Sequence, residues 1–176
     1  MANYRNSRFC ENLNIAQFET DGQYNIPVLK PYVYEPCEFV GFNYARSAKN
    51  KGDKGLHFFV DDYQFERLWR EPLAYINLIG EFHSIMTPDF SLYTDYPKAL
   101  QIYNHYRKHW LGALWQSLGY KVIPTIAWSD QDSFDWCFDG TPKCATVAVS
   151  SVGTQRREET KRLFIDGWNE MLLRLE

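Results

Sequence analysis

The stretch Leu56-His-Phe-Phe-Val-Asp-Asp62 decides the fold, because an apolar run ends in two acidic residues. A short apolar run of this kind is typical of a strand buried in a sheet. A helix-length segment, residues 62–81, separates it from a second apolar run, Ser84-Ile-Met86. A strand, a helix and another strand usually form a parallel pair joined by a right-handed crossover. The sequence therefore predicts a strand-helix-strand unit here.

The same unit recurs outward along the chain. Further strands are predicted at 38–42, 121–128 and 145–150, and further helices at 96–118 and 155–175. Pro72 has no amide donor, so the segment 62–81 is expected to be one kinked helix or a broken pair. We predict one α/β domain over residues 36–176, with a mostly parallel sheet arranged as a partial barrel or doubly wound. Residues 1–35, which include two prolines in an extended run, are expected to form an irregular N-terminal arm.

Two of the predicted helices are amphipathic. Trp110 in the segment 96–118 and Trp168 in the segment 155–175 lie on apolar stripes, and we expect both to be core residues. The polar residues of the first of these helices fall on another face, expected to contact water: Lys98, Gln101, His105, Lys108 and His109.

Composition limits the kinds of partner. A formal net charge of -3 provides no global positive field for non-specific binding to nucleic acid, so any phosphate binding must be local. No continuous apolar segment resembles a signal peptide or a membrane span, which favours the cytoplasm and no membrane partner. The four cysteines lack paired short spacings and are expected to be reduced thiols. A zinc site of Cys137, Cys144 and a histidine is the alternative.

Polar residues follow every predicted strand. Because the carboxyl ends of parallel strands gather loops and helix starts at one edge, ligands usually bind there. The polar residues at this edge are Asn43, Asp61, Asp62, Asp89, Ser91, Ser129, Asp130, Ser150 and Ser151, and all but the last two are candidate ligand-binding residues. Aromatic residues interleave with them, and Tyr93, Trp128 and Trp136 are expected to wall a pocket that stacks a base or a sugar.

Three aspartates from separate strand ends, Asp61, Asp89 and Asp130, are the candidate catalytic and metal-binding residues. Carboxylates that converge on one point suit Mg²⁺ or Mn²⁺, which take oxygen ligands and keep waters for a phosphorylated substrate. The alternative is that each aspartate caps a helix, because an acidic residue between strand and helix often accepts free amides. A third interpretation uses the same carboxylates as an acid and base pair for glycoside hydrolysis.

A basic loop leaves the same edge of the sheet. Residues 46–54 include Arg46 and Lys49, which could hold a phosphate. The alternative is an ordinary solvated loop, which short charge runs usually form. The sequence contains no Walker loop and no G-x-G-x-x-G motif, so nucleotide binding by these common routes is not expected.

Several motifs resemble one known family. They are Val40-Gly-Phe-Asn-Tyr-Ala45, His57-Phe-Phe-Val-Asp-Asp-Tyr-Gln-Phe-Glu-Arg-Leu-Trp69, Thr87-Pro-Asp-Phe-Ser-Leu-Tyr93, Val122-Ile-Pro-Thr-Ile-Ala-Trp128 and Phe134-Asp-Trp-Cys-Phe-Asp-Gly140. In this order and spacing they resemble the family catalogued as domain of unknown function 4417, over roughly residues 26–176. The resemblance implies residence in phages and mobile elements, and it implies no catalytic residues.

Three functional hypotheses follow. The first is a phage or mobile-element accessory protein that binds a phosphate-bearing ligand, a nucleotide or nucleic acid, at the acidic and aromatic edge, with metal-dependent phosphoester hydrolysis as its enzymatic form. The second is a non-catalytic protein-binding module, such as an inhibitor of a host defence system. The third is a carboxylate-based glycoside-processing enzyme.

Overall fold

The computed structural model describes residues 12–33 and 35–176. Its strands are β1 (Thr20–Asp21), β2 (Ile26–Pro27), β3 (Glu38–Gly41), β4 (Lys54–His57), β5 (Ser84–Met86), β6 (Val122–Ile123), β7 (Thr125–Ile126) and β8 (Ala148–Val149). Its α-helices are α1 (Arg67–Arg70), α2 (Ile76–Gly80), α3 (Lys98–Ser117) and α4 (Glu158–Leu175). Short 3-10 helices lie at η2 (Phe42–Tyr44), η3 (Lys51–Asp53), η4 (Asp62–Gln64), η5 (Pro72–Tyr75) and η6 (Gln131–Asp135).

The sheet confirms the predicted mixed α/β fold. Four strands lie side by side in the order β3-β4-β5-β6, and each neighbouring pair is parallel. The strands β7 and β8 form a second parallel pair. Because the spatial order equals the chain order, each connection moves one strand further in the same direction, as in the wall of a barrel. Among the strands of the described residues the sheet does not close, because β3 and β8 each pair with a single neighbour.

The predicted strand 121–128 is two strands, because Pro124 interrupts it. Proline has no amide hydrogen to donate to a ladder, so the chain leaves one sheet at this point and enters the next. Thr87, which follows β5, forms hydrogen bonds to Thr125 in β7 and so links the two sheets. Its Oγ1 accepts a hydrogen bond from the Thr125 amide at 2.8 Å, and its carbonyl accepts one from Thr125 Oγ1 at 2.9 Å. Two buried side chains thus join the end of β5 to β7.

Other boundaries also differ from the expected ones. The strand predicted at 56–60 begins two residues earlier, at Lys54, and ends at His57, while only Ala148–Val149 of the segment 145–150 pairs. The segment 62–81 is a broken pair, with η5 between α1 and α2. In the described part of the N-terminal arm, β1 and β2 form an antiparallel pair.

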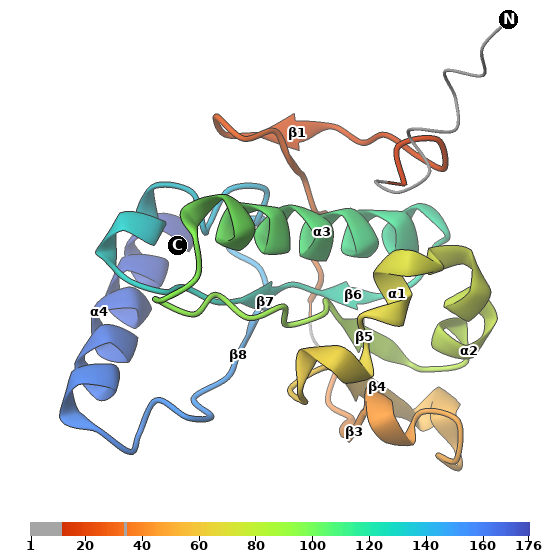
Figure 1. Cartoon of the computed structure of the whole chain (residues 1–176). Coiled ribbons are helices and arrows are strands. Elements are labelled where there is room, and N and C mark those ends of the chain that lie inside the picture. Colours follow the sequence, from red (N-terminus) through yellow and green to blue (C-terminus); the bar gives the residue numbers. More distant parts are fainter. Residues whose placement is uncertain (1–11, 34) are drawn as a thin grey trace, which may run out of the picture.

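Helix α3 is buried on nearly all sides, which contradicts the expected solvated face. Figure 1 shows α3 between the strands and the N-terminal segment that carries β1 and β2. His105, Lys108 and His109 are 0%, 2% and 0% exposed. Backbone carbonyls satisfy part of this face: His109 Nδ1 donates to Pro27 O at 3.0 Å, and His105 Nε2 donates to Asp139 O at 3.1 Å. The arm covers a surface that the helical pattern alone assigns to water.

The two tryptophans predicted to be core residues differ in burial. Trp110 is 1% exposed and packs edge-to-face on Trp69, so this prediction is confirmed. Trp168 is 40% exposed, so this prediction is wrong. Helix α4 lies at one side of the molecule (Figure 1), and Gly167 and Met171 are its buried residues. Only a narrow face of α4 is covered, and Trp168 lies beside that face.

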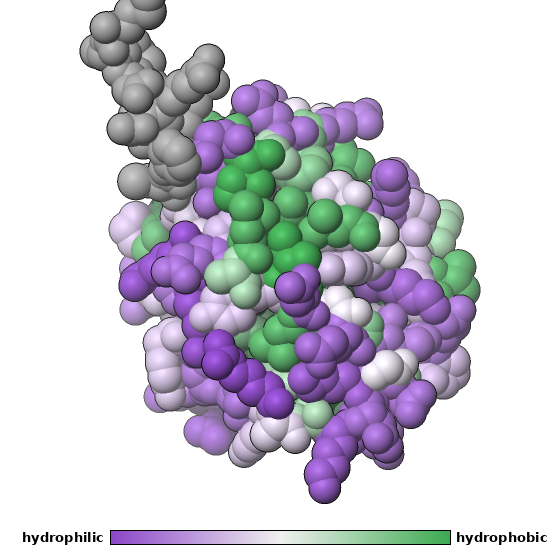
Figure 2. Space-filling view, turned by 90° about the vertical axis from the view of Figure 1, so that its right-hand side faces the viewer, coloured by the Kyte–Doolittle hydropathy of each residue, from purple (hydrophilic) through white to green (hydrophobic). Residues whose placement is uncertain are grey.

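Some apolar surface stays in contact with solvent. Figure 2 shows the side of the molecule on which α1 and α2 lie, with an apolar area among hydrophilic side chains. On the elements of this side, Leu73 in η5 is 55% exposed and Leu118 after α3 is 44% exposed. In the described residues, no helix combines the length and the apolar character that crossing a membrane requires.

Candidate functional site

A cleft of about 760 Å³ opens at the carboxyl ends of four strands. Its walls come from residues 59–63 after β4, residues 89–96 after β5, residues 127–129 after β7, and residues 150–154 after β8, with one side of α4. Ligand pockets commonly measure about 300–1,000 Å³. The cleft therefore has the size of a small-molecule site and lies at the edge where parallel sheets bind ligands.

Many of the predicted site residues meet in this cleft. Those that line it are Asp61, Asp62, Asp89, Ser91, Tyr93, Trp128, Ser129 and Ser150. The lining residues do not include Asn43, Arg46, Lys49, Asp130 and Trp136. The first three of these belong to η2 after β3 and to the loop that follows it. The chain thus assembles most of the expected site from four of the five strand ends, and the basic loop stays outside.

Trp136 is not a wall of the cleft. It is 1% exposed and belongs to a core cluster with Cys137, Ile126 of β7 and Met171 of α4. The segment around it forms the 3-10 helix η6, whose last turn directs this ring inward. The expectation of an aromatic platform at Trp136 is therefore contradicted by its burial.

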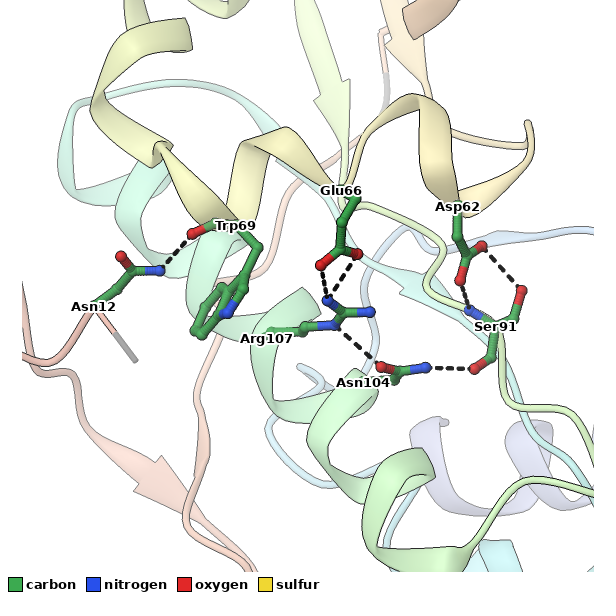
Figure 3. A network of polar contacts seen from close by, with 7 residues as sticks. All are labelled: Asn12, Asp62, Glu66, Trp69, Ser91, Asn104 and Arg107. Carbon is green, nitrogen blue, oxygen red and sulfur yellow. Dashed lines mark hydrogen bonds and ion pairs between the residues drawn. The ribbon is translucent and has the colours of Figure 1, made fainter. Parts of the chain in front are cut away.

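A polar network extends from two residues of the cleft lining, Asp62 and Ser91, into the core (Figure 3). Ser91 donates to the Asp62 carboxylate twice, from its amide to Oδ2 and from its hydroxyl to Oδ1, both at 2.9 Å. Asn104 Nδ2 donates to the Ser91 carbonyl at 2.7 Å, and Arg107 Nε donates to Asn104 Oδ1 at 3.1 Å. The network joins the loop after β4, the loop after β5 and helix α3. It holds Asp62 and Ser91 in one arrangement.

Arg107 anchors the network in the core. Its Nη1 lies 2.7 Å and 2.8 Å from the two carboxylate oxygens of Glu66, and its guanidinium lies 3.7 Å from the centre of the Phe90 ring. The Arg107 side chain is 9% exposed and that of Glu66 28% exposed. A buried, paired charge of this kind is costly to disrupt, so it stiffens the layer beneath the cleft.

Asp89 has an unusual charge environment. Burial, with a smaller effect from the negative charge of Asp62, raises its pKa to about 6, although the buried ammonium of Lys108 opposes that rise. Burial also lowers the pKa of Lys108 to about 8, against the attraction of Asp89. Both groups shift toward neutrality because the loss of hydration outweighs their mutual attraction. Asp89 thus offers the cleft a carboxyl group that changes charge near neutral pH.

Aromatic rings form the walls. Trp128 packs on α4, where its ring lies 5.5 Å from that of Phe164 and its Nε1 donates to the Leu163 carbonyl at 3.1 Å. Gly167 makes this close approach feasible, because a methyl group there would overlap the Trp128 ring. On another wall, Tyr93 and Tyr96 meet edge-to-face with their ring centres 5.1 Å apart. The cleft therefore presents several rings to a ligand.

The three aspartates chosen as metal ligands are only partly brought together. Asp61 and Asp89 line the cleft and Asp130 does not. Across residues 12–33 and 35–176, no three His, Cys, Asp or Glu side chains are arranged so that they could hold a metal ion. This applies equally to the zinc alternative at Cys137 and Cys144, both of which are free cysteines, as is Cys37. Cys10 lies outside the described residues.

The helix-cap alternative is also only partly supported. Asp61 and Asp130 stand at the N-cap positions of η4 and η6, but neither side chain forms a capping hydrogen bond. Asp62 accepts its bonds from Ser91 in another loop. The carboxylate of Asp61 is thus available to the cleft rather than used by the backbone.

Several lining residues were not identified from sequence. Phe164, Thr154 and Thr160 carry no motif, yet all three line the cleft. The segment after β8 contributes because it passes along the cleft before α4 begins. The only available signal was position: these residues follow the fifth predicted strand, as the other lining segments follow theirs.

Comparison with known proteins identifies relatives. The model of the family described as Domain of unknown function (DUF4417) matches residues 18–176. The Gene 1 protein of Mycobacterium phage L5 is 43% identical over 163 residues, which cover 90% of this chain and 70% of that protein. The Gene 1 protein of Mycobacterium phage D29 is 42% identical over 157 residues, which cover 88% of this chain and 58% of that protein. No solved structure matches the chain.

These relatives confirm the phage connection that the sequence motifs implied. The match of the family model covers the cleft and all four strand ends that build it. The chain therefore belongs to the family described as Domain of unknown function (DUF4417).

Proposed function

We propose that this phage-related protein binds a purine nucleoside in the cleft, with guanine as the preferred base. One observation supports this above the others: the cleft combines aromatic walls with three carboxylates, and its lining includes no Lys, Arg or His among the described residues. Such a site favours a flat ligand that donates hydrogen bonds and disfavours a ligand whose buried part is an anion.

The aromatic walls suit a base. Trp128 is held by a hydrogen bond to α4 and by Phe164, so its ring needs little ordering when a ligand binds. Tyr93 is 58% exposed beside the same cleft. Stacking of a base on an aromatic ring contributes about 1–3 kcal/mol and tolerates any base, because every base has a flat face.

The carboxylates select the edge of the base. Asp62 is occupied by Ser91, whereas the side chains of Asp61 and Asp89 form no hydrogen bond within the described part of the chain. An ionised carboxylate only accepts hydrogen bonds. Guanine offers two adjacent donors, its ring N–H and its amino group, which match the two oxygens of one carboxylate. Adenine and cytosine offer a donor beside an acceptor, which a carboxylate would repel.

The test is a binding screen by thermal shift and calorimetry. Guanosine is expected to raise the melting temperature more than adenosine, cytidine, uridine or free sugars. Trp128→Ala is expected to weaken guanosine binding about 5- to 150-fold, the loss of about 1–3 kcal/mol of stacking. Tyr44→Ala, which changes an exposed aromatic residue that does not line the cleft, is the control.

Two outcomes would overturn the proposal. The first is the absence of any nucleoside effect at millimolar concentration. The second is a guanosine effect that Asp61→Asn, Asp89→Asn and Trp128→Ala all leave unchanged. Mg²⁺ and Mn²⁺ are screened alone in parallel, and a shift caused by the ion itself would favour the metal-dependent phosphoester hydrolase expected from the sequence.

The raised pKa of Asp89 favours a second candidate, cleavage of a glycosidic bond. A carboxyl group with a pKa of about 6 can donate a proton to a leaving group, while Asp61 in the same cleft can act as the base or nucleophile. Release of free base or reducing sugar, abolished by Asp89→Asn, would support this candidate. Binding without turnover would favour the non-catalytic form.

A further inference from the structure

We propose that the ligand is a nucleoside phosphate whose phosphate group binds Arg156 and Arg157 at the rim of the cleft. This inference rests on the proposed function, and it names a second part of the same site. The two sources of this chemistry are a free nucleotide and the end of a nucleic acid strand.

Both arginines lie in the segment between two groups of residues that line the cleft. Ser150, Val152, Gly153 and Thr154 line the cleft before them, and Thr160 lines it after them. Residues 150–157 therefore leave the cleft wall and return to it at α4 within a few residues. Arg156 and Arg157 lie at this turning point, and both are exposed.

The connection is held in place. Thr160 Oγ1 lies 2.9 Å from the carbonyls of both Thr154 and Arg157, and Thr154 Oγ1 donates to the Ser151 carbonyl at 2.8 Å. Gly153 has a φ of +82°, which suits glycine and sharpens the turn. These bonds tie the segment to the first turn of α4, which keeps the backbone of Arg156 and Arg157 close to residues that line the cleft.

Charge then orients the ligand. Inside, Asp61, Asp62 and Asp89 repel a phosphate, whereas two guanidinium groups outside attract it. Within the described residues neither Arg156 nor Arg157 forms an ion pair, so both are available to an anion. Guanidinium groups bind phosphate oxygens in a planar, two-point geometry. The base end therefore enters the cleft and the phosphate end remains at the rim.

The neighbouring basic residues are arranged differently. Lys161 and Arg162 line a separate hollow next to the cleft, together with Glu158, Glu159 and Asp166. In that hollow the acidic side chains offset the basic ones, so no anion site results. The pair Lys161 and Arg162 thus provides a matched control on the same stretch of chain.

The experiment compares guanosine, guanosine monophosphate and a short single-stranded oligonucleotide ending in guanosine phosphate, by calorimetry on the full chain. The wild type is expected to bind the monophosphate about tenfold tighter than guanosine, and this gain should shrink with added salt. The double variant Arg156→Gln/Arg157→Gln is expected to lose the gain while keeping its guanosine affinity. Lys161→Gln/Arg162→Gln is expected to keep both.

The outcomes separate the two proposals. Equal affinities for guanosine and its phosphate in the wild type would overturn the rim site and leave the base site standing. A phosphate gain that survives in the Arg156 and Arg157 double variant would also overturn it. Absence of binding by every nucleoside and nucleotide would overturn the proposed function itself. Tighter binding of the oligonucleotide than of the monophosphate would identify a nucleic acid end as the source.

Discussion

At the scale of single residues, Arg107 does not line the cleft, yet it positions residues that do. Its guanidinium binds Glu66, stacks on Phe90 and orients Asn104, which in turn holds the Ser91 carbonyl. Through this chain of contacts a buried arginine of α3 positions the loop after β5. Buried residues of the core therefore position part of the cleft lining.

Replacing Arg107 by alanine should destabilise the protein by about 3 kcal/mol. The Glu66 carboxylate loses its ion-pair partner, and the guanidinium stacked on Phe90 is removed. Arg107→Lys keeps the charge but loses the planar fork, so an intermediate loss is expected. Urea unfolding measures both. Arg70→Ala, at an exposed arginine of α1, is the control and should change stability by less than about 0.5 kcal/mol. A loss below 1 kcal/mol for Arg107→Ala would contradict the role assigned to the network.

Asp89 gives the stability a pH dependence of known sign. Its folded pKa of about 6 lies above the value of about 3.9 for an unfolded chain, so the ionised form is disfavoured in the fold. The penalty is absent below about pH 4, grows between about pH 4 and 6, and is complete above pH 6. Asp89→Asn removes it. The free energy of unfolding of this variant, relative to wild type, should therefore rise by about 1–3 kcal/mol from pH 4 to pH 7.5.

Unfolding at the two pH values tests this expectation. Asp61→Asn, which changes an exposed carboxylate of the same cleft, serves as control. A stability difference between Asp89→Asn and wild type that stays constant from pH 4 to pH 7.5 would refute it. Lys108 and Asp62 are the charged groups that contribute to the shift, so variants of either residue should move the transition.

At the scale of elements, Gly167 sets the distance between α4 and the cleft wall. Glycine in a helix usually costs about 1 kcal/mol relative to alanine, so Gly→Ala often stabilises. Here the added methyl would overlap the Trp128 ring. Gly167→Ala should therefore destabilise by about 1–3 kcal/mol and weaken ligand binding by displacing Trp128.

Thermal melting and the nucleoside titration together check this prediction. Gly52→Ala is the control, because a methyl group there meets nothing within 4 Å. A more stable Gly167→Ala protein with unchanged ligand affinity would show that α4 can shift without moving the wall.

At the scale of the whole molecule, the fold is two parallel sheets joined at Pro124, and the cleft spans both of them. Thr87 is the joint. It is 0% exposed, and its hydroxyl accepts the amide of Thr125, which is 1% exposed. The relative position of the two halves of the cleft thus depends on one buried hydrogen-bond pair.

Thr87→Val leaves the Thr125 amide without an acceptor, which should cost about 1–3 kcal/mol. Because the joint links the loops after β5 and β7, ligand affinity should fall as well. Thr87→Ser keeps the hydroxyl and should retain most of both. Chemical unfolding and calorimetry measure the two effects, and full retention of stability in Thr87→Val would contradict the assignment of a joint.

The sequence by itself determined the parallel α/β fold, the break at Pro72 and the edge at which polar residues gather. Apolar runs separated by helix-length segments are local patterns, and parallel pairing with one hand of crossover follows from chain geometry. For this reason Asp61, Asp89, Ser91 and Trp128 could be assigned to one edge before their contacts were known. Their positions at strand ends were sufficient.

Only the tertiary structure decided which surfaces are covered. The polar face of α3 is buried because the N-terminal arm packs on it, and one ring nitrogen of His109 donates to the Pro27 carbonyl. The exposure of Trp168 could not be predicted, because helix periodicity marks an apolar face without specifying what packs against it. Trp136 is buried because the segment after β7 packs into the core beside Cys137 and Met171. The Arg107 pair, the Thr87 joint and the distance of Asp130 from the cleft likewise depend on segments far apart in sequence. Local patterns report how a segment folds, whereas burial and contact depend on where the rest of the chain packs.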